Sequence, residues 1–245
     1  MANVKLGNKI YENVETVKLD TAEGGTVEFA DRDAAVEAGK QEAYDKFWDA
    51  HQNYGKRTEY HSAFGGLGWN AETFKPKYDI VPTGAMYMFA ECGIIDLVGA
   101  LEACGVVMDF SKCRSFNYML SSGASIKHFP PIDLSSAPNF LDGFRYAVNL
   151  EGASFINVQP AITWGNSFIN CTALKDVTFS GTIGNPIAFS QSSELSAASV
   201  DSVISALADL TGQTAKTVSF HGTVGANMTE EQKAAITAKN WTLVY

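Results

Sequence analysis

The chain has 245 residues, of which 46% are hydrophobic and 18% are charged, and its formal net charge is −9. This composition supports a folded core and excludes a chain that is disordered throughout. The sequence has no basic stripe for nucleic acid or a membrane surface, and no apolar stretch near the roughly 18 residues that a membrane-spanning helix needs.

Residues 1–30 are predicted to form a β-hairpin or a small sheet, and this segment is a candidate docking region. Two short apolar runs, one with Val14, Val17 and Leu19 and the other with Val27 and Phe29, flank a turn at residues 23–25. The first residues lack the apolar centre of a secretory signal, so we expect synthesis in the cytoplasm without export through a signal peptide.

Residues 31–80 are predicted to contain a helix and a connecting loop. The helix begins at Asp31 or Asp33, ends near Gly55 and carries an aromatic face formed by Phe47, Trp48 and Tyr54. The glycine-rich residues 65–68 lack the Lys-Ser/Thr pair and the preceding strand of a phosphate-binding loop. We therefore interpret them as a turn.

Residues 81–190 contain an internal repeat with a step of 24 residues. Aromatic residues recur at positions 116, 140 and 164, and large apolar residues recur at 120, 144 and 168, with an earlier copy at Phe89. Prolines at 130, 131, 138 and 160 exclude one continuous helix, although residues 94–104 favour a local helix. Units of this size bury their apolar edges only by stacking on neighbours. The repeat therefore predicts a short leucine-rich-repeat-like solenoid.

The cysteines and two aspartates are explained by the repeat itself, without a catalytic or metal-binding role. The cysteines stand at positions 92, 104, 113 and 171, with no C-x-x-C pair, which indicates small buried side chains and no zinc ribbon. Asp109 and Asp133, each followed by a serine two residues later, are predicted to form turns by bonding to nearby backbone groups.

Residues 191–245 are predicted to form a C-terminal α/β cap. A helix opens at Ser196 and ends before Gly212, a strand covers residues 217–220, a second helix starts at Thr229 with a capping-box pattern, and a strand closes the chain at 241–244. The predicted fold class is thus α+β, a solenoid flanked by an N-terminal β-hairpin/helix segment and this cap.

The repeat resembles a known family. Met88, Phe89 and Cys92, and the stretch at residues 168–174, resemble the F-x-x-C-x-x-L signature of BspA-like leucine-rich repeat proteins. The stretches at 45–50, 74–79 and 195–242 are similar to a subgroup found in phages and prophages of gut Firmicutes. The resemblance covers about residues 40 to 245. It departs from the family at Gly123 and Ala147, where the signature has Cys.

The resemblance implies a phage virion structural or surface protein, associated with the tail, baseplate or capsid, that serves in assembly or host adhesion. Its expected partners are other virion proteins, or a host-surface protein or glycan, and a homo-oligomer is expected. The expected location is the virion. The alternative is a bacterial cell-surface adhesion or interaction module located outside the cell.

The sequence predicts no catalytic, cofactor-binding or metal-binding residues, and the chain is not expected to be an enzyme. Its four histidines, at positions 51, 61, 128 and 221, fall in four different segments. A second alternative, a tail enzyme acting on polysaccharide, would need two carboxyl groups about 5–10 Å apart. Arg145 and Tyr146, which lie between core positions, are candidates for contact with a partner, but no binding site is predicted.

Overall fold

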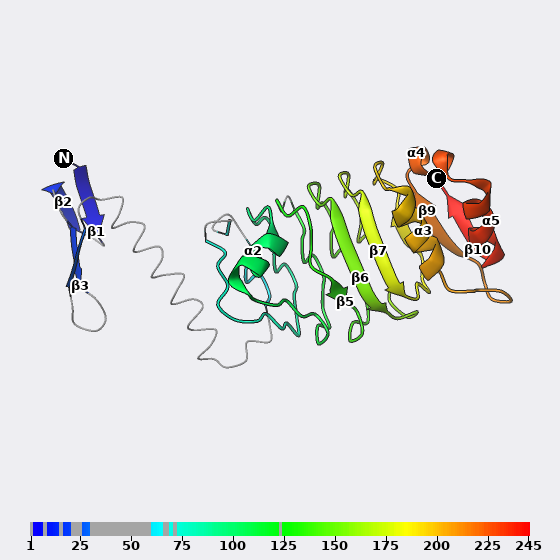
Figure 1. Ribbon diagram of the computed structural model, residues 1–245, viewed down its shortest axis with the longest axis horizontal. Helices are drawn as coiled ribbons and strands as arrows, with labels where there is room; N and C mark the ends of the chain where they lie inside the picture. Colours follow the sequence, from blue (N-terminus) through cyan, green and yellow to red (C-terminus); the bar gives the residue numbers. More distant parts are fainter. Residues whose placement is uncertain are drawn as a thin grey trace. The chain divides into compact units, whose positions relative to one another are not determined.

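The protein is represented by a computed structural model that describes residues 2–6, 9–14, 17–20, 26–29, 60–65, 69–70, 73–122 and 124–245 (Figure 1). Backbone contacts divide the chain into two compact units, Met1–Gly55 and Lys56–Tyr245. The helix predicted between Asp31 and Gly55 lies outside the described residues, as do residues 66–68 of the predicted turn.

The first unit contains two antiparallel strand pairs. β1 (Ala2–Leu6) pairs with β2 (Lys9–Val14), and β3 (Val17–Asp20) pairs with β4 (Thr26–Phe29). The β3–β4 pair joins Val17 and Leu19 to Val27 and Phe29, so a hairpin across the predicted turn is confirmed, whereas Val14 of the first predicted run belongs to β2 and pairs with Ala2.

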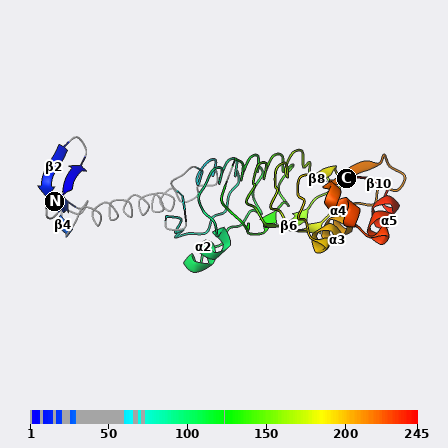
Figure 2. The ribbon, with the colours of Figure 1, turned by 90° about the horizontal axis from the view of Figure 1, so that it is seen from above.

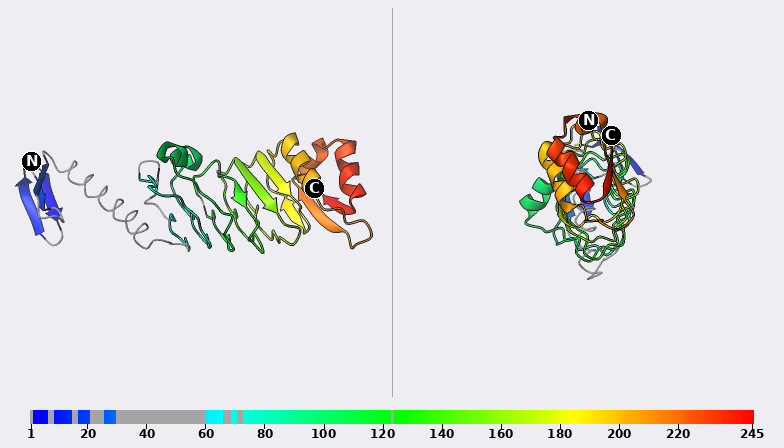
Figure 3. Two further views of the ribbon diagram at one scale, coloured as in Figure 1. Left: turned by 60° about the horizontal axis from the view of Figure 1, so that its bottom comes forward. Right: turned by 90° about the vertical axis from the view of Figure 1, so that its right-hand side faces the viewer.

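The second unit contains two three-stranded parallel sheets (Figure 1). The first sheet has the order β5 (Ile132–Asp133), β6 (Gly152–Val158), β7 (Asp176–Gly181). The second has the order β10 (Trp241–Val244), β9 (Lys216–Phe220), β8 (Ile187–Phe189). The described helices of the second unit are α2 (Leu97–Cys104), α3 (Ala197–Ala206), α4 (Gly222–Asn227) and α5 (Glu230–Ala238). In the end-on view of Figure 3, α2, α3 and α5 lie on one side of this unit.

The predicted fold class, α+β with a short leucine-rich-repeat-like solenoid, is wrong. The described part of the second unit is an α/β fold with two separate parallel sheets and four helices. The second sheet combines β8, which falls in the range predicted for the solenoid, with β9 and β10, which fall in the range predicted for the cap. The repeat in the sequence marks which side chains are buried, but it does not specify which backbone segments pair as strands.

The 24-residue step corresponds to segments that run side by side in parallel (Figure 2). Gly152 pairs with Asp176 and Phe155 pairs with Phe179 in the first sheet. On its surface, the hydroxyls of Ser154 and Thr178 lie 2.6 Å apart. Asn157 donates from Nδ2 to a carboxylate oxygen of Asp133 at 2.8 Å. Equivalent residues of successive segments therefore contact each other directly.

The interior of the second unit is built from aromatic side chains that touch from one segment to the next. The apolar positions at 116, 120, 140, 144, 164 and 168, which the sequence predicts to be buried, are each at most 2% exposed. Ring centroids are 5.1 Å apart for Phe140 and Phe155, 4.6 Å for Phe168 and Phe189, and 5.9 Å for Phe189 and Phe220. The contact from Phe168 to Phe189 and on to Phe220 carries the same core into the second sheet.

Helix caps predicted from the sequence are confirmed. Ser196 accepts a hydrogen bond from the backbone of Ser199 at the start of α3, and Thr229 forms a capping box with Gln232 at the start of α5. The helix predicted within residues 94–104 begins at Leu97, after the N-cap Asp96, and ends at Gly105, whose φ of 64° suits glycine. The predicted strand at 241–244 is β10, whereas α4 was not predicted.

Helix α3 closes the outer edge of the first sheet with side-chain hydroxyls. Ser199, which is buried, accepts from the backbone N–H of Val177 at 2.8 Å and donates to the carbonyl of Lys175 at 3.0 Å. Ser202 accepts from the N–H of Phe179 at 2.9 Å. These hydroxyls take the place of the backbone groups that another strand would supply, so β7 can be an edge strand without leaving buried donors unpaired.

We expect Ser199→Ala to lower the free energy of unfolding by about 1–3 kcal/mol, because it leaves the buried N–H of Val177 without its partner and removes one of the two hydrogen bonds to the carbonyl of Lys175. Chemical denaturation measures this change. Ser205→Ala, at an exposed position of the same helix, is the control and should change stability by less than about 0.5 kcal/mol. Equal effects of the two substitutions would contradict the edge-closing role.

Leu150→Asp and Leu174→Asp test whether the core is continuous, since both side chains are 0% exposed. Each substitution places a carboxylate among apolar groups and should cost more than about 4 kcal/mol, which removes the cooperative thermal transition of the second unit. Val148→Asp, at a position that is 40% exposed, should leave the transition nearly unchanged. A melt of Leu150→Asp at the wild-type temperature would exclude this core assignment.

Candidate functional site

Turn residues with left-handed backbone recur at two positions in successive segments. One position lies two residues before, and the other two residues after, the buried residue Phe64, Phe89, Leu120, Phe144 or Phe168. The occupants of these positions, with φ between 53° and 62°, are Ser62, Tyr87, Tyr118 and Asp142 at the first, and Glu91, Ser122, Tyr146 and Asn170 at the second.

Tyrosine is energetically unfavourable at such a position, because positive φ destabilises a residue with a Cβ atom by about 1–2 kcal/mol. Backbone bonds between segments hold the conformation. Tyr87 donates its N–H to the carbonyl of Asn117 at 3.2 Å, and Tyr146 donates to that of Ile169 at 2.8 Å. Strained positions held in this way are common at functional sites, so these tyrosines are candidates for contact with a partner.

The side chains at these turns form a surface that we name the tyrosine row: Tyr87, Tyr118, Tyr146, Arg145 and Asp142. The rings of Tyr87 and Tyr118 are stacked, with centroids 5.0 Å apart and an interplanar angle of 5°. The guanidinium of Arg145 lies 5.0 Å from the ring centroid of Tyr146 and 3.3 Å from a carboxylate oxygen of Asp142. Tyr87 and Tyr146 are each 40% exposed, so the row is open to solvent.

Arg145 holds one end of the row through its contacts with Tyr146 and Asp142. Its pKa is raised above the usual value, mainly by a hydrogen bond to Tyr146, with further contributions from the charges of Tyr146, Asp142 and Tyr118. A permanently charged, planar group set among tyrosine rings offers hydrogen bonds and stacking at one place.

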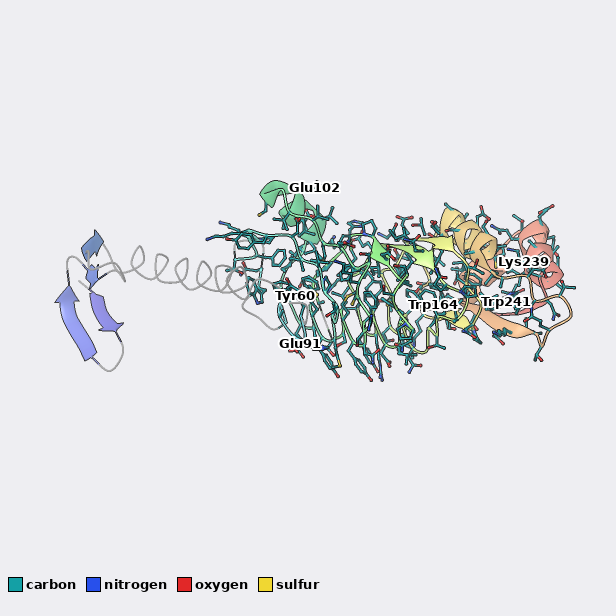
Figure 4. All side chains as sticks on the ribbon, turned by 90° about the horizontal axis from the view of Figure 1, so that it is seen from below. Tyr60, Glu91, Glu102, Trp164, Lys239 and Trp241 are labelled. Carbon is teal, nitrogen blue, oxygen red and sulfur yellow. The ribbon has the colours of Figure 1, made fainter. Side chains whose placement is uncertain are left out.

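The tyrosine row lies on the turn edge of the second unit. Figure 4 shows Glu91, which belongs to the same turn as Tyr87, at the opposite edge from Glu102 on α2. Arg145 and Tyr146 were candidates from the sequence, and the structure brings them together with Asp142. Tyr87 and Tyr118 were missed, although each stands two residues before a repeated core position, which was the available signal.

The aspartates that the sequence assigns to turns do form turns. Asp109 accepts from the N–H of Ser111 at 2.8 Å, and Asp133 accepts from the N–H of Ser135 at 2.8 Å. Burial raises the pKa of Asp133, but hydrogen bonds from Ser135 and Asn157 outweigh it, so the net pKa lies below the ordinary value. This carboxylate is committed to holding the backbone.

A second group of carboxylates belongs to ion pairs between segments. Glu151 lies 2.8 Å from the ammonium of Lys127 and 3.6 Å from that of Lys175, which also approaches Glu194 at 3.7 Å. The hydrogen bond from Lys127 is the main cause of a lowered pKa at Glu151. Carboxyl pKa shifts resolved in the described residues, at Asp133, Glu151, Asp209 and Glu231, are all downward, whereas a general acid for glycoside hydrolysis requires an upward shift.

The described residues contain no group of three or more His, Cys, Asp or Glu side chains that could hold a metal ion. His221 caps α4 by accepting from the N–H of Thr223 at 3.2 Å, while His51 lies outside the described residues. Within the part of the chain that the structure describes, every helix is too short or too polar to cross a lipid bilayer.

The cysteines are free thiols, and three of them, Cys92, Cys113 and Cys171, are buried as the sequence predicts, whereas Cys104 is partly exposed. Burial raises the pKa of Cys92 to about 11 and that of Cys171 to about 12. A thiol with such a pKa forms almost no thiolate near neutral pH, and the thiolate is the reactive form.

We therefore expect the native protein to react with iodoacetamide at pH 8 at Cys104 alone, and the unfolded protein to react at all four cysteines. Intact mass and peptide mapping count the labelled positions. Rapid labelling of Cys171 in the native protein would contradict the burial described above.

Searches of protein-family models, curated proteins and solved structures found no match to this chain.

Proposed function

We propose that this chain is a non-enzymatic contact module of a phage virion surface, which binds a partner protein through the tyrosine row. The virion assignment is supported by the motifs that resemble BspA-like proteins of phages and prophages. The contact role is carried by one observation, a row of tyrosines at left-handed turn positions, in which Tyr87 stacks on Tyr118 and the exposed Tyr146 lies beside Arg145.

The chemistry of the row suits a protein interface. Tyrosine and arginine are enriched among the residues that contribute most to binding between proteins, because they bury large area and also form hydrogen bonds. The turns are held by backbone bonds between segments, so little conformational entropy is lost when a partner binds. We assign the partner to the host surface, and assembly with other virion proteins is the competing outcome.

The first unit is the proposed docking part of the protein. It forms its own strand pairs, and its backbone contacts fall mainly within the unit, which makes it distinct from the second unit. The tyrosine row belongs to the second unit, so docking and partner contact are assigned to different units of the chain.

Substituting the tyrosine row tests the contact role. Tyr87→Asn and Tyr118→Asn remove the rings but keep a residue that adopts left-handed backbone, so the fold should be retained. We expect the double variant to bind intact host cells at least tenfold more weakly than wild type, which corresponds to about 1.4 kcal/mol. Tyr245→Ala, an exposed tyrosine outside the row, is the control and should bind as wild type does.

Treating the cells separates the possible partners. Protease treatment should abolish binding, whereas binding that survives protease and disappears after periodate oxidation would identify a glycan and contradict a protein partner. Equal binding of the double variant and wild type would remove the tyrosine row from the proposal.

The virion assignment has its own measurement. Mass spectrometry of purified particles should detect the protein, and its absence from particles together with a monomeric state in the lysate would contradict that assignment. Cell fractionation that places it on the bacterial envelope would instead support the alternative of a bacterial surface module.

A further inference from the structure

A depression of about 700 Å³ lies on the second unit, separate from the residues of the tyrosine row. It crosses successive segments, and its lining residues are His61, Thr83, Gly84, Lys112, Arg114, Ser115 and Ser136. We name it the basic depression, because its described lining residues include two cationic side chains and no carboxylate.

Backbone bonds between segments hold the wall of the basic depression. Arg114 donates its N–H to the carbonyl of Thr83 at 2.9 Å, and the carbonyl of Ser115 accepts from the N–H of Ala85 at 2.8 Å. Ser136 donates its hydroxyl to the carbonyl of Ser111 at 2.6 Å. The positions that carry the lining side chains are therefore fixed by the same pairing that builds the fold.

The two cations of the basic depression have no acidic partner among the described residues. Lys112 and Arg114 are exposed, and neither forms an ion pair with a residue in that part of the chain. Other lysines do have acidic partners, as Lys127 and Lys175 have at Glu151. The chain has a formal net charge of −9, and two cations side by side in one hollow give a local positive charge that an anion would complement.

We propose that the basic depression binds a tetrahedral oxyanion, namely the phosphate or sulfate ester group of an anionic polymer. The planar guanidinium of Arg114 provides paired donors for oxyanion oxygens, and the ammonium of Lys112 adds a compact charge. The hydroxyl of Ser115 forms no hydrogen bond within the described residues and supplies a further donor. The volume exceeds that of one oxyanion, so a sugar or polyol that carries it also fits.

The proposal does not rest on the proposed function, since it uses none of the residues of the tyrosine row. Unchanged host-cell binding by the tyrosine variants would remove the tyrosine row and leave the anion site intact, and a failure to bind anions would leave the tyrosine row intact.

Titration of the full-length 15N-labelled protein with inorganic phosphate, sulfate and acetate at constant ionic strength tests the site. We expect saturable shifts of the amide signals of Ser115 and Ser136 with phosphate and sulfate, and weaker shifts with acetate. Lys112→Gln combined with Arg114→Gln should weaken binding at least fivefold, and unchanged shifts at other residues will show that the fold is retained. Lys75→Gln combined with Lys175→Gln removes the same charge at exposed positions outside the basic depression and should bind as wild type does.

A second pair of titrations separates the natural sources of the oxyanion. A glycerol-phosphate oligomer and a sulfated oligosaccharide are compared, and the one that binds more tightly than its inorganic ion identifies the carrier. Shifts that rise linearly with all three inorganic anions, or that are identical in the Lys112/Arg114 variant, would overturn the proposal.

Discussion

Contact between aromatic rings of successive segments is the interaction on which the second unit depends. A single segment offers one row of apolar side chains, and that row leaves water only when the next segment covers it. The rings of Phe140, Phe155, Phe168, Phe189 and Phe220 provide this cover in turn, from the first sheet into the second. Phe155 and Phe179, which pair in the first sheet, have ring centroids 5.0 Å apart, so equivalent residues of the parallel strands also meet through their rings.

The same constraint decides where the polar groups go. Turns must reverse the chain within a few residues, so residues with left-handed backbone recur at fixed distances from the core. Carboxylates and hydroxyls near these turns bond to backbone groups, and lysines and glutamates pair between neighbouring segments. The tyrosine row lies at these turns, and the basic depression lies between neighbouring segments, so both proposed contact surfaces are positioned by the same pairing of segments.

Much of the burial pattern could be predicted from the sequence, because a repeated apolar position has few alternatives to the interior. Phe116, Phe140 and Trp164 were assigned in this way, and the caps at Ser196 and Thr229 follow from local chemistry that any helix start shares. The fold class could not be predicted, since apolar spacing does not tell a paired strand from an irregular segment. The end of the first sheet at α3 depends on Ser199 and Ser202, and serines within a helix give no signal of what they bond to.

The candidate site was only half predictable for a related reason. Arg145 and Tyr146 stand out as bulky polar residues between core positions, whereas the stacking of Tyr87 on Tyr118 arises from a register that spans 31 residues in place of 24. The basic depression combines residues from His61 to Ser136, and no spacing pattern in the sequence predicts that these residues lie close together.

The left-handed turns also limit how this protein can diversify. Branching at Cβ makes a positive φ costly, so valine, isoleucine and threonine are poorly tolerated at the eight turn positions, whose present occupants are serine, tyrosine, aspartate, glutamate and asparagine. Substitutions at these positions are therefore restricted mainly to polar and aromatic residues. Such substitutions would change the side chains presented at this edge while leaving the path of the main chain unaltered.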